Sequence, residues 1–219
     1  ACQDEFTPAD LQGRPCFGGL DLGSTRDLTS FALFFPHDDG AVLSWSWCPG
    51  ENLQTREDND RVPYRTWADR GLIEPTGGRG TDKRFVALRL AQIVSQFDVK
   101  LIGFDRWSMA ELERILGEEG IDLPLQSFGQ GFRDQGPAVR AFEEHVLNRT
   151  LRHNNNPLLT WALSNVVPNS DPTGAVKLDK DRSRERIDPV VAAVMAIGLA
   201  AREPEPKHFD FNKPMAISF

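Results

Sequence analysis

Cysteine is scarce in this sequence, with three residues among 219. Cys2, Cys16 and Cys48 are odd in number and have no C-x-x-C spacing, so neither a disulfide framework nor a zinc site is indicated. This pattern favours isolated thiols, as in proteins of a reducing cytoplasm.

Long hydrophobic runs and targeting signals are missing as well. No apolar run approaches the roughly 20 residues that span a bilayer, and residues 1–5 have neither the basic region nor the apolar core of a signal peptide. The glycine-rich stretch 75–80 lacks the spacing of a nucleotide-binding P-loop. Because the sequence does not begin with methionine, we expect it to be an excised or processed part of a longer protein.

The chain also lacks the excess of basic residues that is typical of nucleic-acid-binding proteins, since its net charge is −7. Residues 1–60 contain eleven acidic and three basic residues, and the remainder is close to neutral. Basic residues gather at 79–89 and 177–186. Each group is explained by a solvated charged face, with a phosphate-facing surface as the alternative.

The first part of the sequence predicts an antiparallel meander. Apolar runs at 16–22 and 28–35 indicate two strands, and the Asp-Gly turn at 37–40 leads into a third strand at 41–48 with alternating side chains. Trp45 and Trp47 share one side of that strand, which favours packing on the sheet over stacking on nucleic-acid bases.

The rest of the chain alternates helices with two further strands. Together with the meander, this order predicts an α/β domain of the ribonuclease H type: a mixed sheet, helices on both faces, and a small hairpin insert around 150–180. The expected division is an entry segment 1–15, the domain 16–202 and an extended tail 203–219. Helices are expected at 62–71, 82–97, 110–117, 136–148, 158–166 and 188–201, strands at 99–104 and 123–128, and a hairpin turn at 171–174.

Three carboxylates occupy special positions in this arrangement. Asp21 lies within or at the end of the first strand, Asp105 ends the strand at 99–104, and Asp188 begins the last helix, just before Pro189. Strand ends and helix starts meet at one rim of an α/β sheet, so the three can converge. Two of them also have a structural explanation: Asp188 as a helix cap, and Asp105 as a strand terminator or a partner of Arg106. Asp21 fits a structural role least, because apolar residues flank it.

A cluster of carboxylates requires cations, because like charges repel one another. Ligand sets made only of oxygen suit Mg²⁺ or Mn²⁺. Two such ions, about 3.5–4 Å apart, can activate water and stabilise the leaving oxygen of a phosphodiester. The placement of the three acids therefore predicts metal-dependent phosphodiester hydrolysis.

Several stretches, in one order along residues 16–202, resemble the nuclease domain of tailed-bacteriophage terminase large subunits. The ordered set is far more specific than any single motif. The chain departs from the family pattern between Pro75 and Arg84, which is richer in glycine here. The similar stretches are Gly19 to Thr29, Val62-Pro63-Tyr64 with Trp67, Asp105-Arg106-Trp107, Gln130-Gly131-Phe132, Leu151 to Pro157, Ser164 to Val167, Lys177 to Lys180, and Arg186-Ile187-Asp188.

The resemblance implies a ribonuclease H-like endonuclease that cuts double-stranded, concatemeric viral DNA during genome packaging. It implies that Asp21, Asp105 and Asp188 bind two catalytic Mg²⁺ or Mn²⁺ ions. Lys180 and Arg182 lie in the matching basic segment as possible DNA contacts, with a solvated lysine as the alternative, and His153 is interpreted as a turn residue.

The implied partners are an N-terminal packaging ATPase domain of the full-length protein, the small terminase subunit and the portal protein, with no membrane. The implied location is the host cytoplasm during assembly, with no place in the mature virion.

Three alternatives remain at this stage. The string Asp21 to Thr25 also resembles the phosphate loop of the actin and sugar-kinase ATPases, although that architecture needs a second such loop. A resolvase or transposase of the same fold is another possibility. The non-enzymatic alternative is a catalytically inactive module of a packaging machine. Convergence of the three acids on metal would distinguish the nuclease from this module.

Overall fold

The computed structural model describes residues 6–23, 28–51, 53–105, 109–183 and 185–202. The predicted tail 203–219 and the first five residues of the predicted entry segment lie outside these ranges. Within that segment, Pro8–Leu11 forms a short 3₁₀-helix. The proposed division at residues 15 and 202 stays a prediction.

The antiparallel meander is confirmed. Strand β1 (Pro15–Asp21) pairs with β2 (Thr29–Phe35), and β2 pairs with β3 (Ala41–Pro49). The turn before β3 contains two residues with positive φ, Asp39 and Gly40, as its Asp-Gly sequence favours.

Three further strands extend this meander into a mixed six-stranded sheet with the order β4-β3-β2-β1-β5-β6. Strand β5 (Asp98–Phe104) runs parallel to β1, and β6 (Leu125–Ser127) runs parallel to β5. Strand β4 (Glu74–Thr76) was not expected, because three residues that include a proline carry no alternating pattern. It pairs in parallel with the end of β3.

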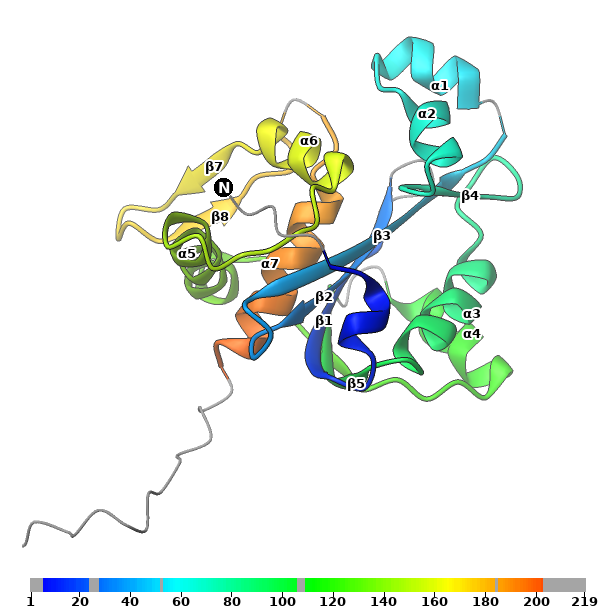
Figure 1. Ribbon diagram of the computed structural model, residues 1–219. Helices are drawn as coiled ribbons and strands as arrows, with labels where there is room; N and C mark the ends of the chain where they lie inside the picture. The colour runs from blue at the N-terminus through cyan, green and yellow to red at the C-terminus, as the bar shows by residue number, and fades with distance from the viewer. Residues whose placement is uncertain (1–5, 24–27, 52, 106–108, 184, 203–219) are drawn as a thin grey trace, which may run out of the picture.

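Helices cover both faces of the sheet (Figure 1). Helices α5, α6 and α7 and the hairpin β7–β8 lie on one side, and α3 and α4 lie on the other. The small hairpin was predicted from its turn, and Gly174 in that turn has φ 84°. The bounds are α1 Leu53–Asp60, α2 Tyr64–Asp69, α3 Lys83–Val94, α4 Ala110–Glu119, α5 Phe132–Leu147, α6 Pro157–Asn165, α7 Asp188–Ala200, β7 Pro168–Ser170 and β8 Val176–Leu178.

Alternation along the strands divides the core into two layers. In β1, Cys16 and Leu20 pack with α3 and α4, whereas Phe17 packs with α5, α6 and α7. Trp45 and Trp47 of β3 both belong to the α3–α4 side, which confirms that they pack on the sheet.

Helix α7 is buried along almost its whole length and lies against β1. A Cβ atom at Gly19 would lie 2.0 Å from the backbone oxygen of Ala192, so only glycine permits this approach. Complete burial of a Val, Leu, Ile or Met side chain stabilises a fold by about 1.5–3 kcal/mol, so the buried large apolar side chains of α7 are a major part of the core.

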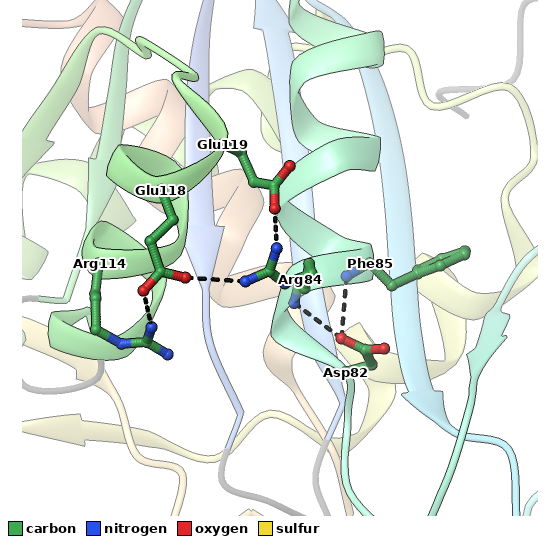
Figure 2. Close-up of polar contacts among 6 residues, drawn as sticks. All are labelled: Asp82, Arg84, Phe85, Arg114, Glu118 and Glu119. Carbon is green, nitrogen blue, oxygen red and sulfur yellow. Dashed lines mark hydrogen bonds and ion pairs between the residues drawn. The ribbon is translucent and has the colours of Figure 1, made fainter.

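The basic residues of 79–89 are paired with acids. Figure 2 shows Arg84 of α3 between Glu118 and Glu119 of α4, while Asp82 accepts hydrogen bonds from the first backbone amides of α3. Asp82 thus caps α3 as its sequence predicted. These ion pairs are exposed and stabilise the fold little individually, and they support a solvated charged face for this group.

Among the described residues, no helix is both long enough and apolar enough to cross a membrane.

The contact at Gly19 generates a stability prediction. We expect Gly19→Ala to destabilise the fold by about 3 kcal/mol, because the added methyl group would force α7 away from β1. Urea denaturation followed by circular dichroism measures the change.

Gly117→Ala is the matched control. Gly117 lies in α4, and no atom lies within 4 Å of the point that a Cβ atom would take there, so alanine should raise stability by about 0.5 kcal/mol. Equal stability of Gly19→Ala and the wild type would show that α7 does not need this approach.

Candidate functional site

Asp21 is the last residue of β1 and lies on the side of the sheet that faces α7. It follows Phe17 and Gly19 at the two-residue spacing of one strand face, and its side chain is 6% exposed. Its partner across the ladder is Ser30 of β2, whose hydroxyl is 2.9 Å from that of Ser46. The apolar strand therefore ends in a buried polar strip.

Asp105 follows the end of β5 beside Asp21. Phe104 pairs with Leu20 in the parallel ladder, so the next residue of each strand is an aspartate. Asp105 is half-buried, and it lines the same cavity of about 280 Å³ as Asp21. The predicted convergence of Asp21 and Asp105 at one rim is what this register produces.

Asp188 does not cap α7. The predicted N-cap role is wrong because Ile187 occupies the N-cap position and Asp188 is the first residue of the helix. The Asp188 side chain is 7% exposed and accepts a hydrogen bond from Lys180, 3.0 Å away. Its carboxylate therefore pairs with Lys180 at the rim of the sheet and does not cap the start of the helix.

Lys180 joins the two buried carboxylates. Its Nζ lies 2.7 Å from Oδ1 of Asp21, 2.5 Å from Oδ2 of Asp21 and 3.0 Å from Oδ1 of Asp188. Lys180 comes two residues after β8, and its side chain is 43% exposed. The hairpin thus places one ammonium group between a carboxylate of β1 and a carboxylate of α7.

The electrostatics of this group are dominated by burial. Burial raises the pKa of Asp21 to about 7; the Lys180 ammonium opposes this change and the Asp188 carboxylate adds to it. Burial lowers the pKa of Lys180, but Asp21 and Asp188 raise it by more, so it lies above its ordinary value. Two carboxylates share the one ammonium of Lys180, and the raised pKa of Asp21 reflects the cost of burying its negative charge beside Asp188.

This set of donors fits a hard divalent cation. Oδ2 of Asp21 is buried, and although the Lys180 ammonium lies 2.5 Å away, no donor among the described residues meets this oxygen with the geometry of a hydrogen bond. Carboxylate oxygens are the ligands that Mg²⁺ and Mn²⁺ prefer. In the described part of the chain, however, no three His, Cys, Asp or Glu side chains lie close enough together to hold a metal. Asp21 and Asp188 meet through Lys180.

The residues with a predicted role toward DNA lie on the same segment. Lys180 is held by the acids, a role that sequence reasoning missed because no local pattern links residues 21, 180 and 188. Arg182 is 68% exposed, and its Nε lies 3.6 Å from Asp179. Gly23 lines a second cavity of about 280 Å³ together with Lys180 and Asp188, whereas Ser24, Thr25 and Arg106 lie outside the described residues.

Two glutamines at the site were not singled out for their side chains. Gln135, buried in the first turn of α5, donates to Oε1 of Gln130 at 2.6 Å and accepts from the backbone amide of Leu178 at 2.8 Å. Gln130 lines the cavity of Asp21 and Asp105. The amide of Gln135 therefore attaches β8, and through it Lys180, to α5.

Other groups with possible chemistry lie elsewhere. His153 belongs to the turn before α6, where its carbonyl oxygen accepts from the Asn156 amide, in agreement with its predicted turn role. Burial raises the pKa of Cys16 to about 12 and that of Cys48 to about 11, so neither thiol is suited to act as a nucleophile. Cys2 lies outside the described residues.

Comparison with known proteins gives one family. A family model for the terminase large subunit, endonuclease domain, matches residues 3–204. The chain is 38% identical over 201 residues to the terminase large subunit of Enterobacteria phage HK97, covering 91% of this chain and 40% of that relative. It is 26% identical over 214 residues to protein YmfN of Escherichia coli K12, covering 91% of this chain and 46% of that relative. The chain thus spans less than half of either relative.

Solved structures agree with the fold. The crystal structure of the HK97 large terminase superposes with a TM-score of 0.81 at 38% identity, covering 86% of this chain and 40% of that chain. The large terminase nuclease of thermophilic phage G20c superposes with a TM-score of 0.57 at 13% identity, covering 85% of this chain and 84% of that chain. These matches confirm the predicted ribonuclease H-like mixed sheet with helices on both faces.

The hydrogen bond from Leu178 to Gln135 predicts a local effect. We expect Gln135→Leu to speed amide exchange at Leu178 by about tenfold or more, because the amide loses its buried acceptor. Hydrogen exchange followed by NMR measures the rate, with the amides of α3 as an internal reference. Gln126→Leu, at an exposed position of β6, is the control; unchanged exchange at Leu178 in Gln135→Leu would show that this bond does not hold the hairpin.

Proposed function

The chain belongs to the family of terminase large subunit endonuclease domains, and we propose that its acidic rim performs metal-dependent hydrolysis of double-stranded DNA. Terminases of this family use their nuclease in genome packaging, and membership of the family supports a hydrolase activity for this chain. The observation that carries the proposal is the burial of Asp21 and Asp188 side by side at the sheet edge where Asp105 also lies.

In this proposal Asp21, Asp105 and Asp188 are the residues that hold two Mg²⁺ or Mn²⁺ ions. When bound, the ions would activate a water molecule and stabilise the leaving oxygen. The large terminase nuclease of phage G20c, which shares the fold, has been solved with bound magnesium and with bound cobalt. That ion choice agrees with the oxygen-only donors of this chain.

The protein's own contribution is the placement of these acids. Asp21 is fixed by the ladders of β1 with β2 and β5, and Asp188 by the buried first turn of α7. Such rigid positions keep the carboxylates in place as charge develops in the transition state. The proposed products carry a 5′-phosphate and a 3′-hydroxyl.

The proposed substrate is concatemeric viral DNA in the host cytoplasm. The proposed partners are a packaging ATPase domain in the remainder of a longer protein, the small terminase subunit and the portal protein. With a net charge of −7, the domain alone should bind DNA weakly and in a salt-dependent way. A motor that holds DNA near the rim compensates for this weak affinity. The resolvase, transposase and ATP-binding alternatives have no separate observation in their favour.

Cleavage of supercoiled plasmid tests the proposed function. We expect the wild type to nick and linearise plasmid with Mn²⁺ or Mg²⁺, and to stop when EDTA removes the ion. Asp21→Asn, Asp105→Asn and Asp188→Asn should each lower the rate by about 100-fold or more, because loss of even an outer partner of a metal ligand costs about 10–100-fold.

Asp69→Asn, at an exposed position of α2, is the control and should cut like the wild type. Circular dichroism establishes that each variant is folded. If the three site variants cut at the rate of the wild type, the assignment of these acids is wrong.

A further inference from the structure

The ammonium group of Lys180 occupies the oxygens that face the proposed metal site. It lies within 3.0 Å of both oxygens of Asp21 and of Oδ1 of Asp188. A divalent ion of the Mg²⁺ kind binds such oxygens at about 2.0–2.1 Å. One set of oxygens cannot serve both cations, because a metal ion among them would meet a like charge at contact distance.

The segment that carries Lys180 is fixed at its backbone. Gln135 holds the amide of Leu178, and Asp179 accepts hydrogen bonds from the amides of Asp181 and Arg182. The four-carbon side chain beyond that backbone is 43% exposed. Lys180 also lines both cavities at the rim, so its ammonium has open space beside the carboxylates. The side chain can therefore leave the acids while the hairpin stays in place.

We propose that Lys180 is a positioning residue that acts as the internal counter-ion of Asp21 and Asp188 and is displaced when a divalent ion binds. Without metal, the ammonium keeps two buried carboxylates together. With metal, the ion takes over their charge and Lys180 turns to the cavity. Lys180 thereby weakens metal binding while it stabilises the metal-free fold. This inference rests on the proposed metal site.

Mn²⁺ binding measured by titration calorimetry tests the exchange. Lys180→Met keeps an unbranched side chain, one atom shorter than lysine, and removes its charge. We expect it to bind Mn²⁺ about tenfold or more tightly than the wild type, since a neighbouring unit charge changes cation binding by this order. The thermal midpoint of the metal-free variant should fall. If Lys180 had only a structural role, Lys180→Met would lower both the affinity for Mn²⁺ and the thermal midpoint.

Lys100→Met is the matched control, because Lys100 of β5 is also a lysine in an ion pair but lies away from the rim. Its side chain is 45% exposed, close to the 43% of Lys180, and its ammonium lies 2.6 Å from the Asp98 carboxylate. Lys100 is five residues before Asp105 along β5, which separates it from the acidic rim by about 16 Å. Its substitution should leave Mn²⁺ affinity within about twofold of the wild type. All titrations use one alkaline buffer, in which protons compete least with the metal.

The wild type supplies a second readout that does not depend on the folding of a variant. Acetylation of Lys180 by an amine-reactive ester, followed by mass spectrometry, should speed up when Mn²⁺ is added, because the freed ammonium is more accessible. Acetylation of Lys100 should not change.

The outcomes separate this inference from the proposed function. The metal site stands if the wild type binds Mn²⁺ and Asp21→Asn does not. If, in that case, Lys180→Met binds Mn²⁺ no more tightly than the wild type and Mn²⁺ leaves the acetylation of Lys180 unchanged, the proposed exchange is wrong. If neither the wild type nor Lys180→Met binds Mn²⁺, both fail. Tighter binding by Lys180→Met together with faster acetylation supports the exchange.

Discussion

The close approach of helix α7 to strand β1 at Gly19 is the constraint on which the rest of this structure depends. The missing side chain lets the backbone of the helix lie directly on the backbone of the strand. That contact fixes α7 on the central strands and fills the layer between the sheet and α5 and α6. It also sets the position of the first residue of the helix relative to the last residue of the strand. The site is thus a consequence of core packing.

Much of the fold could be predicted from sequence because its signals are local. Two apolar runs and the alternation of the third strand indicated the meander, Asp82 marked the start of α3, and Asp171 to Gly174 marked the hairpin. Strand β4 could not be predicted, since three residues become a strand only by pairing with the end of β3. Asp188 was misplaced by one position at the helix start because Pro189 is acceptable in either of the first two helical positions.

The site was predictable in part. Asp21 stood out as a charge in an apolar strand, and the topology placed Asp105 beside it. The position of the Lys180 ammonium was not predictable, because it depends on where the hairpin packs against α5. The signal for that packing is one buried amide, Gln135, in a stretch whose sequence resembles an ordinary helix start. Sequence patterns carry least information about contacts between side chains from distant segments of the chain.

The burial of α7 has a further consequence for the order in which the three acids are synthesised. Among the described elements, α7 is the last to leave the ribosome, and it alone carries Asp188. A nascent chain that ends before this helix contains Asp21 and Asp105, but the face of the sheet at Gly19 lacks the helix that packs on it. The cell that translates the message is therefore not exposed to a complete set of the three acids until the whole domain has been synthesised.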